Sequence, residues 1–227
     1  MEKLLRFLEK AEGRDKVLKV IQYFGRFQKS IVSNKFTIRF MNLSYAARLS
    51  RQIFRLGKSF LELHNIRNSI KKDFLDNFTK FLTILMSASM CVRWLFDNLS
   101  VLSAYKIIEF DHREFTKAST TAWVFALIFK LTNCSQEMMK SYAREAMLKE
   151  TSIGKTTRWV VENLDELSQT RRKMILEIAK TIGDLIIASN GALIPYKVLG
   201  KQFSEKWVGI GGVVSACISI FEIWYDC

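Results

Sequence analysis

The sequence predicts an all-α membrane protein, with a basic amphipathic-helix region near its N-terminus and a transmembrane helix near its C-terminus. Three observations lead to this fold class. One proline and ten glycines in 227 residues suit long helices and argue against a many-stranded β fold. Positive charge is concentrated in the first 80 residues, which hold 18 Lys/Arg and 7 Asp/Glu. Finally, an uncharged apolar stretch of 15 residues begins at Trp207.

The first helical region combines apolar periodicity with a long basic stretch. Apolar side chains recur at helical spacing within residues 2–32, at Val17, Val20, Ile21, Phe24, Phe27 and Ile31. Between Asp15 and Glu62 the chain carries ten Lys/Arg and no acidic residue. The basic character therefore belongs to the N-terminal third, which predicts an anionic partner for that part of the chain.

Residues 38–60 are predicted to form one amphipathic helix. With about 100° between successive residues, one face gathers the apolar side chains Ile38, Tyr45, Leu49, Ile53, Leu56 and Phe60, flanked by Leu43 and Phe54. The opposite face carries Arg48, Arg51, Arg55 and Lys58. Such a helix can lie on an anionic membrane, where each Lys or Arg contributes about 1 kcal/mol. We expect insertion of Leu49, Ile53, Phe54 and Leu56, and binding of anionic headgroups by the four basic residues.

Two other interpretations fit a basic amphipathic helix. It can cover the core of its own domain, but its single-signed polar face lacks the Glu–Lys pairs that usually accompany a solvated helix. It can bind nucleic-acid phosphates, but the apolar face would then need a separate partner, and neither a DNA-binding motif nor an aromatic stacking platform is evident. The predicted partner is therefore an anionic phospholipid membrane and not nucleic acid.

The middle region, residues 81–206, is predicted to be helical, with interfacial or membrane segments left open. It contains three uncharged runs, at 81–92, 118–129 and 185–196. A helix of that length reaches roughly 18 Å, short of the roughly 30 Å hydrocarbon core. Each run by itself therefore predicts a buried or interfacial helix, although the second extends to Gln136 across a single lysine.

The C-terminal segment, residues 207–225, is the predicted transmembrane helix. Trp207 stands at one end and Trp224 at the other, about 26 Å apart in a helix, close to the separation of two interfacial aromatic belts. Small residues four apart predict close helix packing, at Gly211, Ser215 and Ser219. The alternative is a glycine-rich apolar helix in the core of a soluble protein.

A search for catalytic chemistry predicts that the chain is not an enzyme and has neither a cofactor nor a metal site. The two histidines, His64 and His112, are far apart in the sequence. Gly154, Lys155 and Thr156 resemble the end of a phosphate-binding loop, but the position of its first glycine is Lys149. A loop without that glycine cannot cradle phosphate groups in the way the motif requires.

Three segments resemble the peroxin eleven family of peroxisomal membrane proteins. The run at 13–23 is similar to the opening of that family and contains Gly13, Arg14, Asp15, Lys16, Gln22 and Tyr23. The segment from Arg48 to Lys58 resembles its basic amphipathic helix ending in an Arg-Leu-Gly-Lys turn. The apolar helix from Gly209 to Ser219 is similar to its last membrane segment. The resemblance spans the chain, with its most specific residues in the first 60.

The resemblance implies an integral protein of the peroxisomal membrane whose N-terminal region, residues 1–80, faces the cytosol and remodels the membrane. Its amphipathic helix would insert, bend and elongate the membrane, and so promote peroxisome proliferation and fission. The resemblance also implies self-association, and partnership with a dynamin-related fission GTPase and its tail-anchored adaptors. The N-terminal excess of positive charge agrees with a cytosolic N-terminal region.

A second function stays open at this point, an oligomeric channel for small metabolites across the peroxisomal membrane. Charged residues beside the apolar runs could line its pore, since charges within a membrane often mark a transport pathway. The candidates are Arg93, Asp97, Lys130 and Asp184.

Overall fold

The computed structural model describes residues 2–32, 35–72, 76–151 and 158–225, and among these residues every regular element is a helix. The N-terminal helices are α1 (Glu2–Glu9), α2 (Ala11–Ile31), α3 (Lys35–Phe54) and α4 (Lys58–Lys71). Three longer helices follow, α5 (Asn77–Ala104), α6 (His112–Thr151) and α7 (Arg158–Gly191). The chain ends with the short α8 (Ile194–Leu199) and with α9 (Glu205–Tyr225). The predicted all-α fold is confirmed.

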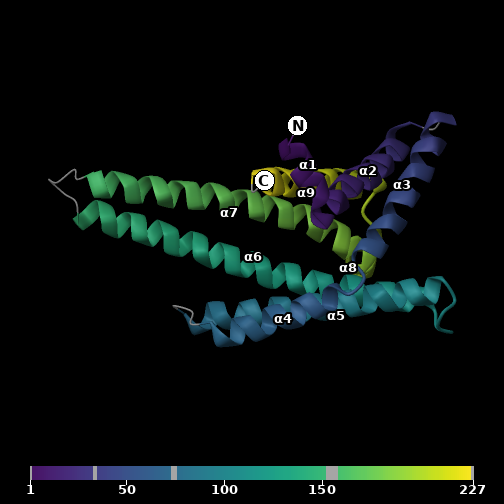
Figure 1. Cartoon of the computed structure of the whole chain (residues 1–227), viewed down its shortest axis with the longest axis horizontal. Coiled ribbons are helices and arrows are strands. Elements are labelled where there is room, and N and C mark those ends of the chain that lie inside the picture. The colour runs from purple at the N-terminus through teal and green to yellow at the C-terminus, as the bar shows by residue number, and fades with distance from the viewer. Residues whose placement is uncertain (1, 33–34, 73–75, 152–157, 226–227) are drawn as a thin grey trace.

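The long helices pack side by side into an elongated body (Figure 1). α6 and α7 form its longest hairpin, and α5, joined to α4, lies along the outer side of α6. On the other side, α9 packs against both α7 and α2, and α3 packs against α2. The neighbours in space therefore run in the order α4, α5, α6, α7, α9, α2, α3, so the two ends of the chain meet in the middle of the body.

Helix α9 is in close contact with both of its neighbours because it presents glycines to them. On the α2 side, a Cβ atom added to Gly212 would lie 2.1 Å from the Tyr23 ring. On the α7 side, a Cβ atom on Gly211 would lie 2.9 Å from the carbonyl oxygen of Gly183. Small residues let helix backbones approach closely, so these glycines set the separation between the three helices.

One helix boundary differs from that predicted. Residues 38–60 do not form one helix, because α3 ends at Phe54 and α4 begins at Lys58. Gly57 lies between them with φ +76°, a left-handed conformation that favours glycine and interrupts a helix. Helix α2 of the predicted region 1–80 packs along α9 of the predicted region 207–225, so these two regions are in contact.

Helix α9 is the one helix among the described residues that is long and apolar enough to cross a membrane. This agrees with the predicted C-terminal transmembrane helix. Its packing explains the serines within it. Ser215 is fully buried, and Ser219 is buried and donates a hydrogen bond to the Ser215 carbonyl oxygen at 2.9 Å.

The N-terminus of α5 yields a prediction about pH. The Asp76 carboxylate accepts hydrogen bonds from the Phe78 N–H at 3.0 Å, Thr79 Oγ1 at 3.1 Å and Gln136 Nε2 at 2.9 Å. Led by the Phe78 bond, the hydrogen bonds from Phe78, Lys140 and Thr79 lower the pKa of Asp76 from 3.8 to about 2. A lowered pKa means that the stabilisation is present above pH 3.8 and is lost as the pH falls towards 2. We expect the melting temperature of Asp76→Asn to change less with pH across this window than that of the unmodified chain.

Candidate membrane-binding site

Helix α3 presents an apolar surface to the outside of the body. This surface, the outer face of α3, consists of Ile38, Leu43, Tyr45, Ile53 and Phe54, all of them exposed. Ile38 is 62% exposed and Ile53 is 57% exposed, although large apolar side chains normally seek burial. Arg39 and Arg48 are exposed on the same helix. The outer face therefore combines bulky apolar groups with two positive charges.

The buried side of α3 is small and polar. Its members recur mostly at seven-residue spacing, which keeps them on one side of the helix, and they are Thr37, Ser44, Ala47 and Arg51. Ser44 Oγ donates a hydrogen bond to the carbonyl oxygen of Gln22 in α2 at 2.7 Å. A Cβ atom on Gly25 would lie 2.7 Å from Ser44 Cβ, so the two helices are in close contact. The polar side of α3 thus faces the protein and the apolar side faces outwards.

The residues predicted to insert into the membrane are mostly available for it. Ile53 and Phe54 lie on the outer face of α3, and Leu56 is exposed in the turn that follows. Leu49 is half-buried. The apolar surface continues onto α4, where Phe60 is 75% exposed.

Three of the four residues predicted to hold headgroups point into the body, and this corrects the predicted basic face. Only Arg48 is exposed. Arg51 is 7% exposed and donates hydrogen bonds to Asp15 Oδ1 at 3.1 Å and to Gln22 Oε1 at 2.6 Å. The guanidinium of Arg55 and the ammonium of Lys58 lie over the Trp94 ring, 5.6 Å and 5.3 Å from its centroid.

The cause of this correction lies outside α3. Arg55 Nε is 3.8 Å from Asp97 Oδ2 of α5, and Arg51 pairs with Asp15 of α2. A helical wheel shows which residues share a face, but it does not show the carboxylates that distant helices bring to that face. Burial alone would oppose ionisation of Asp15, but Arg51, Arg55 and Lys16 together hold its pKa below the usual value.

The residues of the family motif in α2 have structural partners. Asp15 and Gln22 bind Arg51 as described, and Tyr23 packs against Gly212. A Cβ atom on Gly13 would lie 2.2 Å from the carbonyl oxygen of Phe7, so glycine permits the contact between α1 and α2. Arg14 lies over the Phe54 ring at 5.6 Å, and Lys16 pairs with Glu12 at 3.6 Å.

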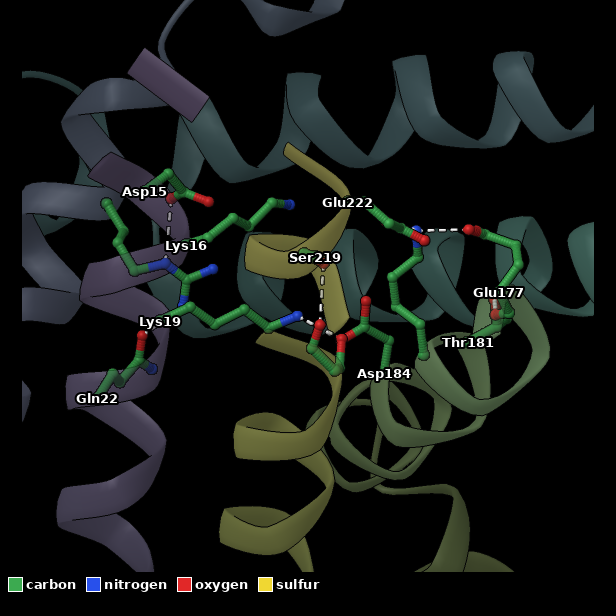
Figure 2. A network of polar contacts seen from close by, with 12 residues as sticks. Asp15, Lys16, Lys19, Gln22, Glu177, Thr181, Asp184, Ser219 and Glu222 are labelled. Atoms are coloured by element: carbon green, nitrogen blue, oxygen red, sulfur yellow. Dashed lines mark hydrogen bonds and ion pairs between the residues drawn. The ribbon is translucent and has the colours of Figure 1, made fainter. Parts of the chain in front are cut away.

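A network of charged side chains connects α2, α9 and α7 (Figure 2). Lys19 Nζ of α2 donates to Asp184 Oδ1 of α7 at 2.6 Å and to Ser215 Oγ of α9 at 2.8 Å. Beside this triad, Lys180 of α7 donates to Glu222 of α9 at 2.6 Å. Burial lowers the pKa of Lys19 to about 8, against the opposing charge of Asp184, so the ammonium is still protonated at neutral pH.

Sequence reasoning missed this network because its members are far apart in the chain. Lys19 is separated by 165 residues from Asp184 and by 196 from Ser215. The small-residue spacing in the last helix did single out Ser215, but as a packing residue and not as a hydrogen-bond partner. Nothing in the sequence identifies which of the many charged residues would form a hydrogen bond with Ser215.

The four residues proposed to line a pore lie instead at contacts within one chain. Asp184 pairs with Lys19, Asp97 lies near Arg55, and Lys130 forms an ion pair with Glu177. Arg93 is buried between two tryptophan rings. These contacts give the channel alternative no support, and it stays a prediction.

The part of the chain that the structure describes contains no group of three or more His, Cys, Asp or Glu side chains that could hold a metal ion.

The chain is similar along its whole length to proteins of the peroxisomal membrane. A family model described as peroxisomal biogenesis factor 11 (PEX11) matches residues 1–224. The peroxisomal membrane protein 11 homolog of Dictyostelium discoideum is 23% identical over 99% of this chain and 94% of its own length. Peroxisomal membrane protein PMP30B of Candida boidinii is 21% identical, and PMP27 of Saccharomyces cerevisiae is 23% identical, each over 98% of this chain and 93% of its own. No solved structure matches the chain.

Proposed function

The chain belongs to the peroxisomal biogenesis factor 11 family, whose members are peroxisomal membrane proteins, and on this premise we propose that it bends and elongates that membrane. In this proposal the outer face of α3 inserts into one leaflet, and the resulting curvature promotes proliferation and fission. The protein acts mechanically, without catalysis. The observation that carries the proposal is the inverted pattern of α3, whose polar side is buried against α2 and whose apolar side is exposed.

The apolar side chains supply most of the expected attraction. Burying one large apolar side chain contributes about 1.5–3 kcal/mol, whereas a basic residue near an anionic surface contributes about 1 kcal/mol. The outer face offers five apolar groups, whereas Arg39 and Arg48 are the exposed cations among the α3 side chains from Thr37 to Phe54. Binding therefore depends more on apolar insertion than on charge, and salt weakens it only modestly. Volume added to one leaflet alone favours curvature towards that side.

Orientation and partners extend the proposal. The N-terminal helices face the cytosol, so α3 enters the cytosolic leaflet, and α9 makes the protein integral to the membrane. The chain self-associates, and it works with a dynamin-related fission GTPase and its tail-anchored adaptors. The exposed apolar side chains present on all helices from α1 to α9 support both a lipid environment and contact between copies.

The test is a double substitution, Leu43→Glu with Ile53→Glu, in the full chain. Both positions are exposed, so the two new carboxylates do not disturb the packing of α3 on α2. Each carboxylate removes apolar contact and is repelled by anionic lipid. We expect loss of tubulation when the purified protein is reconstituted into anionic vesicles that are viewed by electron microscopy.

The matched control is Thr132→Glu with Ser135→Glu, which adds the same charge at exposed positions of α6. This variant should tubulate vesicles like the unmodified chain. Unchanged tubulation by the α3 variant, at equal incorporation and with an unchanged melting temperature, would overturn the proposed mechanism.

A further inference from the structure

A cavity of about 700 Å³ lies inside the helical body, and its lining is strongly basic. It is bordered by residues of α2, α3, α4, α5, α6, α7 and α9, and it is partly open to the outside. Nine Lys or Arg side chains but only five carboxylates line it, so the walls carry an excess of positive charge. Its volume falls within the range of small-molecule sites, roughly 300–1,000 Å³.

The carboxylates of the cavity are mostly engaged by particular cations. Asp15 pairs with Arg51 at 3.1 Å, and Asp184 with Lys19 at 2.6 Å. Glu222 pairs with Lys180 at 2.6 Å, and Glu12 with Lys16 at 3.6 Å. These pairs account for four of the five acidic side chains in the lining. The excess positive charge must therefore reside on cations outside these pairs.

Arg93 is the clearest of these cations. It is 8% exposed, and among the described residues no carboxylate lies within ion-pair distance of it. Its guanidinium is sandwiched between indole rings, 4.1 Å from the Trp94 centroid and 3.7 Å from the Trp123 centroid. Its side chain makes one hydrogen bond, to Met90 Sδ at 3.7 Å. Four of the five N–H donors of a guanidinium are left without an acceptor in the described part of the chain.

Lys58 lines the same cavity, and its ammonium lies 5.3 Å from the centroid of the Trp94 ring that Arg93 also contacts. No described carboxylate is within ion-pair distance of Lys58 either. The indole faces offset part of the cost of burying these charges through cation–π contacts. A buried charge without an ion-pair partner still destabilises the folded protein. A bound anion would remove that cost and use the free donors of Arg93.

We propose that this cavity binds an anion that bears a phosphate group, held by Arg93 and Lys58. A guanidinium presents paired N–H groups that match two oxygens of a phosphate, and Lys58 adds a second charge for a group that carries about −1.5 to −2. The volume leaves room for an organic substituent beside the phosphate. The ligand is thus a phosphate ester, supplied by a lipid headgroup or by a soluble metabolite. This site is separate from the outer face of α3, which points away from the body.

The test measures the melting temperature and the tryptophan fluorescence of the full chain in nanodiscs of zwitterionic lipid. Three probes distinguish the sources, namely inorganic phosphate, glycerol 3-phosphate and dihexanoyl phosphatidic acid. We expect a saturable rise in melting temperature, because a ligand that binds only the folded state stabilises it. A response to the soluble probes indicates a soluble ester, and a response to phosphatidic acid alone indicates a lipid headgroup.

Arg93→Gln and Lys58→Gln should each weaken the response at least about tenfold, as expected for the loss of a charge-assisted hydrogen bond. Neither change breaks an ion pair within the described chain, so both variants should fold, and each tests the site independently. Arg67→Gln, at an exposed position of α4, is the matched control and should respond like the unmodified chain. The proposal is overturned if no probe gives a saturable response, if sodium chloride at equal ionic strength reproduces it, or if both variants keep it.

Discussion

Gly212→Val is expected to separate α9 from α2 and to lower the melting temperature by roughly 5 °C or more. A Cβ atom at this position would lie 2.1 Å from Cγ of Tyr23, at the base of the ring, where rotation of the side chain gives little relief. The neighbouring contact is also too close for a side chain, since a Cβ atom on Gly209 would lie 2.8 Å from the backbone nitrogen of Phe27. The helices must therefore move apart, which would also disturb the hydrogen bond between Lys19 and Ser215.

The control for this substitution is Val214→Leu, which adds volume on the exposed side of α9. Thermal unfolding of both variants in the same detergent should leave the control within about 2 °C of the unmodified chain. Equal melting temperatures for the two variants would show that α2 and α9 are not packed as described.

Arg51→Gln is expected to be the most destabilising single change in α3, by about 3–5 kcal/mol. It removes the partner of Asp15, whose side chain is 5% exposed, and leaves that carboxylate buried without its ion pair. It also removes the hydrogen bond to Gln22 at 2.6 Å. The double variant Asp15→Asn with Arg51→Gln eliminates the unpaired charge, so it should recover much of the loss. Chemical denaturation of the reconstituted protein measures the free energy of unfolding of the unmodified chain, the single variant and the double variant.

Arg48→Gln separates this structural role from membrane binding. Arg48 is exposed, so its loss should leave the free energy of unfolding nearly unchanged and should weaken binding to anionic vesicles slightly. Reversed results, with Arg51→Gln stable but unable to bind vesicles, would restore the interpretation that Arg51 holds lipid headgroups.

The helical character of the chain and the position of α9 could be predicted because both depend on local pattern. Apolar spacing, the scarcity of proline and an uncharged run near the C-terminus are visible in the sequence itself. The break in the helix after Phe54 could also have been predicted from the sequence. Gly57 sits inside the predicted helix, and a glycine at such a place often ends a helix in a left-handed conformation.

The arrangement of the helices could not be predicted, and with it the roles of the basic residues. Arg51 and Lys58 look equivalent to Arg48 on a helical wheel. In the structure, however, Arg51 pairs with Asp15 of α2, and Lys58 lies over the ring of Trp94 of α5. Contacts between residues far apart in the chain depend on tertiary packing, which local periodicity does not encode. For the same reason, the hydrogen bonds among Lys19, Asp184 and Ser215 could not be predicted from the sequence.

Three ion pairs join α9 or its contacts to α2 and α7, which makes this part of the helix compatible with a medium of low polarity. Lys19 of α2 pairs with Asp184 of α7 beside α9, and Lys180 of α7 pairs with Glu222 of α9. In the first turn of α9, Glu205 accepts two hydrogen bonds from Arg26, of 2.6 and 2.9 Å. Charged groups inside a membrane are usually paired in this way. These pairs help to hold α9 against α2 and α7.

Photocrosslinking from position 53 tests most directly whether the outer face of α3 lies in lipid. A diazirine side chain is placed there in the full chain, and in a second sample at the exposed position 169 of the charged part of α7. Both are reconstituted into anionic vesicles that contain labelled phospholipid. We predict lipid adducts from position 53 and few from position 169. Absence of lipid adducts from position 53, in folded protein bound to the vesicles, would contradict insertion of α3.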